Sequence, residues 1–412
     1  MKIGPLPARH LVLLLGAPSL SALLLLACVG EDPKVGSPDA AGSPEASAED
    51  RGTPPPPPPD SSAPDAGGDA AMTCPGKLVP CGSVCTDLSS SNENCGACGK
   101  SCGGGICTNS ACGVAVVRDN IAKLNGLAVD DASLYFTDAD KVFSCPLDAC
   151  TTPPKQLAAM IAYDAQKISV DSGFIYFESA PNQATQRPNI YRCPIAGCPN
   201  PPTSIAADGL NGIRSFLTFQ KSMYANLGGS GINRVDCSSG ACSAGTLVVT
   251  RPVEQFAVDA QRVYFNDTTG GSSQLSSCPL TTACTTRTTL TQTRILGDIA
   301  VTGNLVYFVG PGITTGAAGV FACPTATACA TPTVLTKTAG EIPNLAVDGS
   351  GIFWTEEDKL MSCPSVGCPG GPRTIASGLS SVGLLRLDTK FAYFRTNGTT
   401  AGTSAIKRVA RP

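Results

Sequence analysis

The stretch Leu127-Ala-Val-Asp-Asp-Ala-Ser-Leu-Tyr-Phe-Thr-Asp138 decides the fold, because its pattern recurs along the chain. A short apolar segment is followed by an Asp, three turn residues and a second apolar segment with an aromatic pair. In every copy an anchor residue stands six positions before the first aromatic residue, at Val129 and Tyr135, Val170 and Tyr176, Thr218 and Tyr224, Val258 and Tyr264, Val301 and Tyr307, Val347 and Phe353, and Leu387 and Tyr393. The copies lie 41, 48, 40, 43, 46 and 40 residues apart, which predicts a repeat architecture.

Each copy is interpreted as the inner half of a four-stranded antiparallel propeller blade. In the first copy the predicted strands are residues 126–129, 134–137, 141–145 and 154–159. Their alternating pattern, rich in aromatic and β-branched residues, is typical of strands. The Asp after the anchor is expected to cap its own turn through its side chain. Residues 113–412 therefore predict an all-β fold, a seven-bladed β-propeller.

The seventh copy lacks a fourth strand, and a segment before the first copy can supply it. After Tyr393 the sequence offers one more strand, Ala405–Val409. The orphan segment Val114–Val117 ends twelve residues before the first anchor, and the fourth strand of the first blade, around Leu157 and Ala158, likewise lies about twelve residues before the second anchor. We expect this segment to pair with Ala405–Val409 and close the ring, which removes two exposed sheet edges.

One cysteine pair accompanies each of the first six copies, with a separation of five or six residues. A gap this short across a hairpin is within reach of a disulfide. Closing such a loop removes conformational entropy from the unfolded chain worth about 2 kcal/mol. A metal site is not expected, because each pair lies on a separate blade without another soft ligand. We predict six structural disulfides, which join Cys145 to Cys150, Cys193 to Cys198, Cys237 to Cys242, Cys278 to Cys284, Cys323 to Cys329 and Cys363 to Cys368.

The aromatic segments Leu134–Asp138 and Ile352–Glu356 resemble those of the YWTD and NHL propeller families. The resemblance implies a propeller scaffold. It implies no ligand, because the specificity of those families resides in loops that do not match here. YWTD propellers have six blades, whereas this sequence has seven copies.

The first 27 residues have the features of a secretory signal peptide. Lys2 and Arg9 precede an apolar run, Leu11–Leu26, that Gly16, Pro18 and Ser19 interrupt. The sequence Leu25-Leu26-Ala27-Cys28 resembles the bacterial lipoprotein signal. The resemblance implies cleavage before Cys28 and acylation of that residue, which anchors a protein on a membrane without spanning it. The alternative is a plain secretory signal.

Residues 28–73 predict a disordered linker. The segment 29–73 has ten prolines, including the run 54–59, and no aromatic residue. Such a composition cannot bury enough apolar surface to fold, and the proline run favours polyproline II. The linker would hold the folded parts away from the membrane; a proline-rich docking motif is the alternative.

Residues 74–112 predict a small cysteine-rich module. Eight cysteines, at 74, 81, 85, 95, 98, 102, 107 and 112, accompany few core candidates, namely Leu78, Val79, Val84, Leu88 and Ile106. Four disulfides are expected, with 105 pairings open. The run 81–102 resembles the stigma-specific cysteine-rich protein family, copies of which occur in exported proteins of predatory soil bacteria. Together with the signal, this resembles a myxobacterial-type lipoprotein. Zinc binding or redox activity at Cys95-x-x-Cys98 are the alternatives.

The chain from residue 28 onward has no histidine, because His10 is the only one in the sequence. Ser–His, Cys–His and His–metal chemistry are therefore excluded. Residues 28–412 carry 27 Lys and Arg (29 minus 2) against 32 Asp and Glu, a net charge of −5. This mild acidity argues against nucleic acid as a partner.

One face of the predicted propeller carries the loops that vary in length. These B–C loops, between the second and third strands, are residues 179–189, 267–274, 309–319 and 397–404. The opposite face carries the constant A–B turns and the cysteine loops, so binding is expected on the variable face. Polar residues just before the inner strands could form a ring for a small ligand or peptide, at Asn125, Gln166, Arg214, Glu254, Asp298 and Asn344.

These observations predict a monomeric, exported lipoprotein anchored at the bacterial cell envelope, in the outer membrane or at the surface. It is expected to act as a non-enzymatic binding or scaffold propeller for a protein, peptide or glycan, without a cofactor. The alternative is a lactonase- or lyase-like propeller enzyme, in which Glu254 and Asp298 would help to hold Ca²⁺. A purely structural role in the envelope is a third interpretation.

Overall fold

The computed structural model describes residues 72–412 except 149, 151–152, 161–163, 181–187, 206–212, 239–241, 244, 272, 282, 313 and 315. The predicted signal peptide, Cys28 and nearly all of the predicted linker lie outside the described residues, as does most of the loop 179–189. No helix in the described part of the chain is long and apolar enough to cross a membrane.

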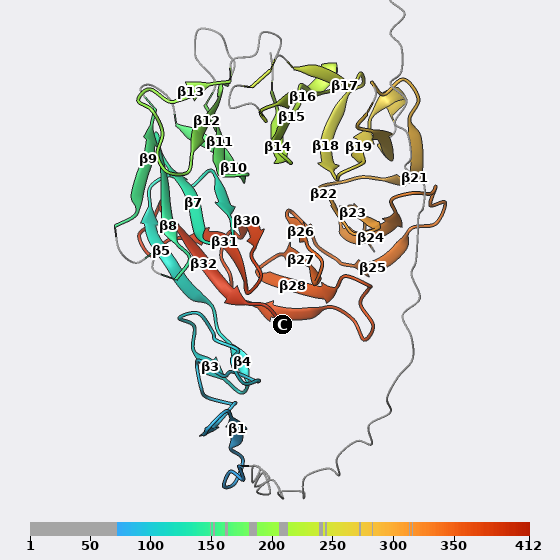
Figure 1. Cartoon of the computed structure of the whole chain (residues 1–412). Helices are drawn as coiled ribbons and strands as arrows, with labels where there is room; N and C mark the ends of the chain where they lie inside the picture. Colours follow the sequence, from blue (N-terminus) through green and yellow to red (C-terminus); the bar gives the residue numbers. More distant parts are fainter. Residues whose placement is uncertain are drawn as a thin grey trace, which may run out of the picture. The chain divides into compact units, whose positions relative to one another are not determined.

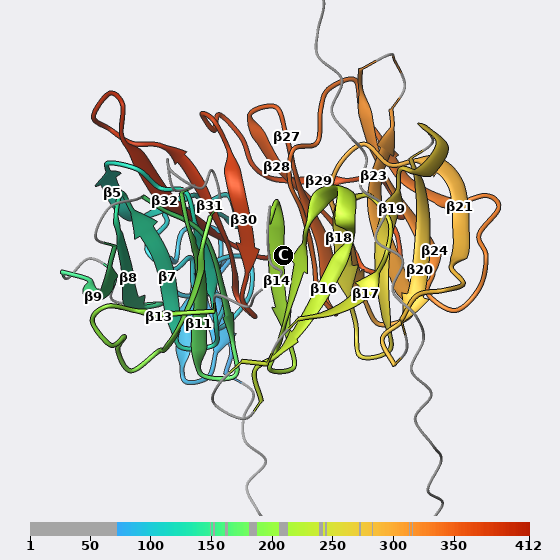
Figure 2. The same ribbon diagram turned by 90° about the horizontal axis from the view of Figure 1, so that it is seen from above.

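Seven four-stranded antiparallel sheets follow one another around a common centre, which confirms the predicted seven-bladed β-propeller (Figure 1). The innermost strand of each sheet faces the centre, and Figure 2 shows the sheets from the side. From inner to outer edge, blades 1 to 3 are β6(Leu127–Val129) β7(Ser133–Asp138) β8(Lys141–Pro146) β9(Lys155–Ala159), β10(Ala165–Asp171) β11(Phe174–Ser179) β12(Ile190–Pro194) β13(Thr203–Ser204) and β14(Ser215–Phe219) β15(Ser222–Asn226) β16(Ile232–Asp236) β17(Thr246–Val249). Blades 4 to 6 are β18(Val253–Val258) β19(Arg262–Asp267) β20(Gln274–Pro279) β21(Thr288–Arg294), β22(Ile299–Thr302) β23(Leu305–Pro311) β24(Ala318–Pro324) β25(Thr333–Lys337) and β26(Leu345–Val347) β27(Gly351–Glu356) β28(Lys359–Pro364) β29(Arg373–Ala376).

Blade 7 combines the two ends of the described chain. Its strands are β30(Gly383–Leu387), β31(Phe391–Asn397), β32(Ser404–Ala410) and β5(Ala115–Ile121). The outermost strand β5 pairs antiparallel with β32, with Ala115 opposite Arg408 and Val116 opposite Lys407. The predicted closure of the ring by the orphan N-terminal segment is therefore confirmed.

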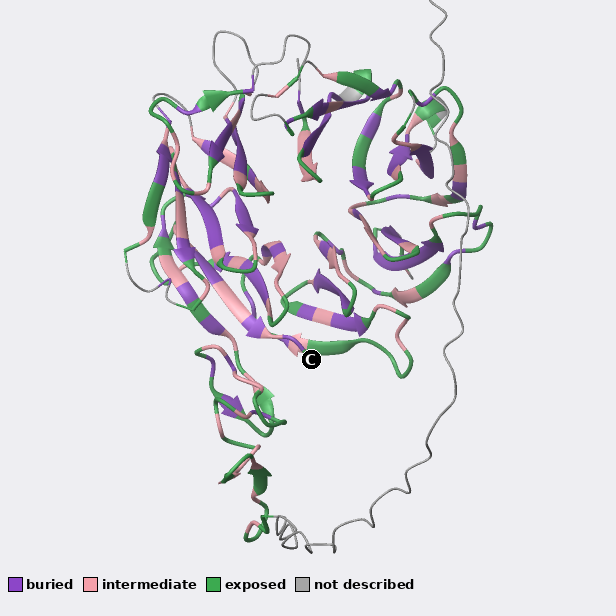
Figure 3. Ribbon diagram, viewed as in Figure 1, coloured by how far each residue is buried: buried purple, intermediate pink, exposed green. Residues whose placement is uncertain are grey.

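The aromatic pair of the repeat fills the spaces between blades. Because neighbouring side chains of a strand point to opposite faces, the two aromatics enter different boundaries. Tyr264 packs with Val306 and Cys323 of blade 5, whereas Phe265 packs with Tyr224 of blade 3. Buried residues accordingly concentrate in the strands of the blades (Figure 3).

The Asp that follows the anchor caps its own turn in blades 1, 4, 6 and 7. In blade 2 the expectation is wrong, because Asp171 accepts a hydrogen bond from the backbone N–H of Lys221 in blade 3, at 2.6 Å. Asp130 accepts hydrogen bonds from the backbone N–H groups of Ala132 and Ser133, at 2.9 and 2.7 Å. Its second carboxylate oxygen accepts a bond from the hydroxyl of Tyr135 at 2.8 Å. The same pattern recurs for Asp259 with Tyr264 and for Asp388 with Tyr393. The repeat motif is therefore a scaffold that ties the turn to the buried aromatic.

Each of the six cysteine pairs forms a disulfide within its blade, which confirms the predicted pairing. The bonds join Cys145 to Cys150, Cys193 to Cys198, Cys237 to Cys242, Cys278 to Cys284, Cys323 to Cys329 and Cys363 to Cys368. Each bond closes the short loop between the third and fourth strands of one blade.

The second cysteine of each pair also contacts the preceding blade, which the sequence interpretation did not foresee. Cys150 packs in the cluster that contains Tyr393 of blade 7. Cys242 and Cys368 are only half-buried, and each lies against a core cluster that contains an aromatic of the preceding blade, Tyr176 and Tyr307 respectively.

Backbone hydrogen bonds strengthen these contacts between blades. The N–H of Cys198 donates to Leu157 O at 3.3 Å, and the N–H of Cys284 donates to Val248 O at 2.9 Å. Both carbonyls belong to the outermost strand of the preceding blade. The disulfide loops therefore fill the boundaries between blades as well as closing a hairpin.

The cysteine-rich module is held by the disulfides Cys74–Cys85, Cys81–Cys98, Cys95–Cys107 and Cys102–Cys112. Its strands are β1(Val79–Cys81), β2(Val84–Thr86), β3(Cys107–Thr108) and β4(Ala111–Cys112). Three of the expected core candidates are wrong: Val79, Val84 and Ile106 are 38%, 61% and 72% exposed. A module this small cannot enclose aliphatic side chains, and its centre consists of cystine sulfur instead.

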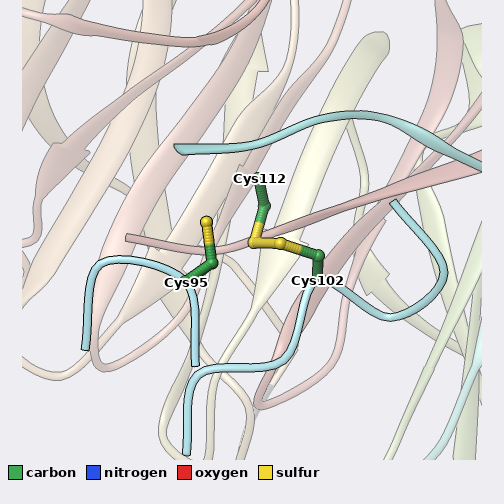
Figure 4. A group of neighbouring side chains, drawn as sticks. All are labelled: Cys95, Cys102 and Cys112. Carbon is green, nitrogen blue, oxygen red and sulfur yellow. A yellow bond between two sulfur atoms is a disulfide. The ribbon is translucent and has the colours of Figure 1, made fainter. Parts of the chain in front are cut away.

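Three module cysteines lie close together in Figure 4, with the sulfurs of Cys95, Cys102 and Cys112 within 4.8 Å of one another. Cys102 is bonded to Cys112, and Cys95 is bonded to Cys107. Because a thiolate is the metal ligand and the nucleophile, two adjacent disulfides offer neither function. The proximity therefore reflects packing of two cystines.

The module contacts the propeller through Gly103. Its carbonyl oxygen accepts a hydrogen bond from Arg408 Nε at 2.8 Å, and the Arg408 guanidinium lies 4.7 Å from the ring centre of Phe391. A Cβ atom on Gly103 would approach that ring to 2.5 Å, and the residue has a φ of +57°. Arg408 also donates to Leu147 O, in the disulfide loop of blade 1. The module therefore sits against the face that carries the disulfide loops.

Candidate functional site

Hydrogen bonds join the A–B turns to the disulfide loops on one face, as predicted. The N–H of Leu147 donates to Ala132 O at 3.2 Å, and equivalent bonds link Ile195 to Gly173 and Leu280 to Gln261. The D–A segments and the B–C loops lie at the other ends of the strands. We call this opposite face the open face.

A cavity of about 700 Å³ lies on the open face at blade 5. Its walls are the D–A segments before and after blade 5 and the B–C loop of that blade. The lining residues are Gln255, Arg294, Leu296, Gly297, Asp298, Val309, Pro311, Thr314, Gly316, Ala317, Ala318, Glu341, Ile342 and Pro343. This volume is within the range of small-ligand and peptide sites.

The cavity combines apolar walls with a few charged groups. Leu296 is 44% exposed although it is a large apolar side chain, and Val309 and Ile342 add buried apolar surface. Arg294 and Glu341 are exposed and carry opposite charges. Apolar surface with a few oriented polar groups is the usual composition of a binding site.

Asp298 is the most buried charged group in the wall. Its Oδ2 accepts a hydrogen bond from the backbone N–H of Leu345 at 3.1 Å, across the boundary to blade 6. Burial raises the pKa of this carboxyl, while the Leu345 N–H and the positive charge of Arg386 oppose the shift. The carboxylate therefore lacks full compensation of its charge by the protein.

Arg386 lies on β30 of blade 7. Burial lowers the pKa of its guanidinium, and the charge of Asp298 opposes this shift. The side chain is half-buried and donates a hydrogen bond from Nη1 to Leu385 O at 2.8 Å. Arg386 is not among the residues that line the cavity.

Arg386 did not emerge from the sequence interpretation, although the repeat contains a signal for it. It stands immediately before the seventh anchor. The residues at this position in the other copies are uncharged, namely Ala128, Ser169, Leu217, Ala257, Ala300 and Ala346. Comparison of the seven copies at this position singles out Arg386, because it is the only charged residue among uncharged and mostly small ones.

The structure does not bring the six predicted ring residues together in the cavity. Asp298 lines it, whereas Asn125 donates to Ala165 O at 3.3 Å and Asn344 donates to Thr355 Oγ1 at 3.1 Å. Arg214 and Glu254 are exposed, and Gln166 is half-buried.

The six predicted ring residues occupy two different positions of the repeat. Asp298 and Asn344 stand three residues before their anchors, and the other four stand four residues before theirs. A shift of one residue turns a strand side chain to the opposite face. In blade 4 it is Gln255, the neighbour of Glu254, that lines the cavity.

Glu178 is a second buried charge that the sequence interpretation missed. It is 8% exposed, and its Oε2 has no hydrogen-bond partner in the part of the chain that the structure describes. Burial raises its pKa to about 7, against the opposing charge of Lys167. In blades 1 and 4 the equivalent residues, Thr137 and Asn266, accept hydrogen bonds from inner-strand N–H groups.

The carboxylates required for the Ca²⁺-dependent alternative do not converge. Glu254 does not line the cavity with Asp298. Within the described residues, the only group of three potential His, Cys, Asp or Glu metal ligands is the cysteine trio of the module.

Comparison with known proteins supports the fold and assigns no family. No family model and no curated protein match the sequence. The β-propeller domain of the Trilobed protease from Pyrococcus furiosus is 12% identical, with a TM-score of 0.50 over 70% of this chain and 95% of that chain. U3-55K is 7% identical, with a TM-score of 0.51 over 73% of this chain and 98% of that chain.

PorZ of Porphyromonas gingivalis, described as an essential bacterial surface component of the type-IX secretion system, is also similar. It is 14% identical, with a TM-score of 0.50 over 73% of this chain and 39% of that chain. At these identities each similarity shows the propeller fold alone. The ten disulfides are typical of proteins that mature in an oxidising, exported environment.

Proposed function

We propose that this protein is a binding propeller of the bacterial cell envelope, tethered by a lipid on Cys28, whose ligand enters the cavity on the open face. The observation that carries the binding role is the cavity of about 700 Å³ itself. It combines the B–C hairpin of blade 5 with two D–A segments, and it exposes Leu296. Exposed apolar side chains within a hollow mark interaction sites.

The cysteine count supports the lipid anchor. The chain has 21 cysteines, and the ten disulfides use 20 of them, all from Cys74 onward. Cys28 has no cysteine of this chain left to pair with. An odd cysteine in an exported protein needs a separate explanation, and the lipoprotein-like signal Leu25–Cys28 supplies one.

The place of the module favours binding on the open face. Gly103 contacts Arg408 and Phe391 at the face with the disulfide loops. The module therefore occupies the face with the disulfide loops, and the proposed ligand enters at the opposite, open face.

In vivo photo-cross-linking tests the binding role. A photoreactive benzoylphenylalanine replaces Leu296 in the full-length chain, on intact cells that produce it. The matched control replaces Val334, which is 50% exposed on the outer strand β25. We expect an adduct at position 296 that Ala317→Trp, which fills the cavity, abolishes. Adducts of equal yield at both positions would overturn the proposal.

The tether has its own test. Cys28→Ala should leave the folded protein in the soluble fraction after cell fractionation, whereas the wild type stays with the membranes. Membrane association of the Cys28→Ala protein equal to that of the wild type would contradict lipidation at this residue.

A further inference from the structure

Asp298 is held in the wall of the cavity by hydrogen bonds from two blades. Its backbone carbonyl accepts a bond from the N–H of Val309 at 3.1 Å, and its Oδ2 accepts one from the N–H of Leu345 at 3.1 Å. Val309 belongs to β23 of blade 5, and Leu345 begins β26 of blade 6. The carboxylate is therefore oriented by the fold itself, as a preorganised binding group is.

The second carboxylate oxygen of Asp298 is available to a ligand. Oδ1 accepts no hydrogen bond from the described part of the chain, and yet it is not one of the buried side-chain oxygens that lack a partner. Solvent therefore reaches it, and because Asp298 lines the cavity, the cavity is where a ligand can meet this oxygen. An ionised carboxylate has about four acceptor positions, so most of its capacity is unused.

The lining has an excess of negative charge. Asp298 and Glu341 are acidic, and Arg294 is the one basic residue among the described lining residues. Arg386 lies outside the lining, and no ion pair within 4.0 Å joins it to Asp298 in the described structure. Arg294 and Glu341 are exposed, so water screens their charges. The half-buried Asp298 is therefore the charge that a bound ligand has to neutralise.

We propose that the cavity binds the side chain of a lysine presented by a peptide or protein, with its ammonium group on Asp298 Oδ1 and its aliphatic stem along Leu296 and Val309. This inference rests on the proposed function, because it assigns a ligand class to the same cavity. A lysine side chain packs its methylene stem on apolar surface while its charged end reaches a polar group. The lining provides the apolar surface and the carboxylate together.

The carboxylate of Asp298 suits lysine better than arginine. A guanidinium is matched best by a carboxylate that presents both oxygens to its planar fork. Oδ2 already accepts the Leu345 N–H, so Oδ1 is the oxygen that is fully available. A compact ammonium needs one such oxygen for one of its three donors. For the other donors, Gln255 and Glu341 supply side-chain oxygens in the same lining.

The α-ammonium at the start of a peptide is the other common source of this charge. It has no aliphatic stem, so reaching Asp298 would bring peptide groups against the apolar wall at Leu296 and Val309. Peptide groups buried without hydrogen-bond partners cost free energy. The apolar wall therefore favours the lysine side chain over a free N-terminus.

The test compares tripeptide amides that differ in one feature. The parent probe is acetyl-alanyl-lysyl-alanine amide. Norleucine in place of lysine keeps the stem without the charge, and arginine in its place keeps a charge. The fourth probe is the norleucine peptide with a free N-terminus. Binding of each probe to the full-length protein, extracted from membranes in detergent, is measured by calorimetry.

We expect the lysine probe to bind most tightly. The norleucine probe should bind about 10-fold more weakly or worse, because it loses a charged hydrogen bond. The arginine probe should bind at least about 3-fold more weakly than the lysine probe, because its fork meets a carboxylate with one oxygen engaged. The norleucine probe with a free N-terminus should stay within about 2-fold of the acetylated one.

Variants locate the contact. Asp298→Asn removes the charge and keeps an oxygen for the Leu345 N–H, so the lysine and norleucine probes should then bind within about 2-fold of each other. The matched control Glu254→Gln removes an exposed carboxylate outside the lining and should keep the wild-type ratio of the two affinities within about 2-fold. Each ratio is taken within one protein, so a change in its stability does not alter the comparison. Ala317→Trp should abolish binding of the lysine probe.

The proposal is overturned if the lysine probe does not bind at about 10 mM, a concentration that detects even weak sites. It is also overturned if the norleucine, arginine or free N-terminus probe binds as tightly as the lysine probe. Persistence of the preference for lysine in Asp298→Asn, or of binding in Ala317→Trp, would overturn it as well. An adduct at position 296 that persists in any of these cases would leave the proposed binding role standing and remove only the ligand class.

Discussion

The boundary between blades 4 and 5 and the boundary between blades 6 and 7 fill the same space with different chemistry. At the first, Tyr264 donates to Asp259 at 2.7 Å, and the disulfide Cys323–Cys329 packs in the same cluster. At the second, Phe353 replaces the tyrosine. Val409 takes the register position of the first cysteine, since it pairs with Ala392 as Cys323 pairs with Val306.

The substitutions at the second boundary are coupled. Without a tyrosine hydroxyl, the Oδ2 of Asp348 is available to Arg411, which pairs with it at 2.6 Å. The Arg411 guanidinium also lies 4.8 Å from the ring centre of Phe353. A covalent loop and a hydrogen bond from a tyrosine hydroxyl to a carboxylate are thus exchanged for an ion pair and a cation–π contact. The repeat fixes the shape of a boundary, and more than one set of interactions can hold it.

The largest expected effect is the removal of one disulfide. The double substitution Cys323→Ala with Cys329→Ala should lower the free energy of unfolding by about 2 to 4 kcal/mol, because the unfolded chain regains loop freedom and the boundary loses buried sulfur. Denaturant unfolding of the full-length protein without reductant, with the other disulfides intact, measures this. A loss below about 0.5 kcal/mol would mean that the disulfide loops contribute little to the boundaries.

Arg411→Ala should cost less, about 1 to 2 kcal/mol, because Asp348 is 35% exposed on its side chain and water screens the pair. The exposed Arg373→Ala on blade 6 is the matched control. Burial tends to raise the pKa of Asp348, but the hydrogen bonds from Arg411 and Ser350 outweigh it and lower the pKa. A carboxyl with a lowered pKa stabilises the fold above its usual pKa of 3.8 and loses this contribution as the pH falls below it.

Unfolding free energies of the wild type and Arg411→Ala at pH 7 and pH 3 test this sign. The difference between the two proteins should shrink at pH 3. An undiminished difference at the lower pH would show that Arg411 acts by packing on Phe353 instead of through its charge.

Tyr264→Phe should cost about 1 kcal/mol at pH 7, because one partly buried hydrogen bond is lost while Asp259 keeps its turn contacts. Burial and the neighbouring Asp259 carboxylate raise the pKa of the Tyr264 hydroxyl. The unfolded tyrosine therefore loses its proton first as the pH rises above about 10, and the folded state loses stability there. The variant should show a smaller alkaline loss than the wild type in melts between pH 9 and pH 11, and an equal loss would contradict this assignment.

The architecture could be predicted because the repeat records it in several independent ways. The anchor-to-aromatic spacing, the capping Asp and the cysteine pairs all lie within single blades, so they depend on local geometry. The closing strand was also predictable, because Val114–Val117 kept the offset of a fourth strand. Local chemistry and register are what a repeat sequence carries best.

The contacts between blades were less predictable from the same cysteines. That Cys150 pairs with Cys145 follows from a separation of five residues, which is a local property. That Cys150 packs near Tyr393, more than two hundred residues away, follows only from closure of the ring.

The candidate site was also less predictable because its residues come from different blades. The cavity is lined by residues of blades 4 and 5 and of the segment before blade 6, and no local pattern joins them. Irregular pairing adds to the difficulty: the register of β10 with β11 shifts between Ala165 and Ile168, and that of β18 with β19 shifts between Val253 and Phe256. A bulge at these points changes which side chain faces the centre, and a position counted from the anchor cannot reveal it.

Phe353→Tyr should have the smallest effect at pH 7, within about 0.5 kcal/mol of the wild type, because its new hydroxyl meets an Asp348 that Arg411 already occupies. In the Arg411→Ala background the same substitution should stabilise the fold by about 1 kcal/mol, since the hydroxyl then gains the partner that Tyr264 has in Asp259. Unfolding free energies of the four proteins form a double-mutant cycle, and the coupling should be about 1 kcal/mol. A coupling free energy near zero would contradict the prediction, because it would mean that Phe353 and Arg411 contribute independently to the stability of the boundary.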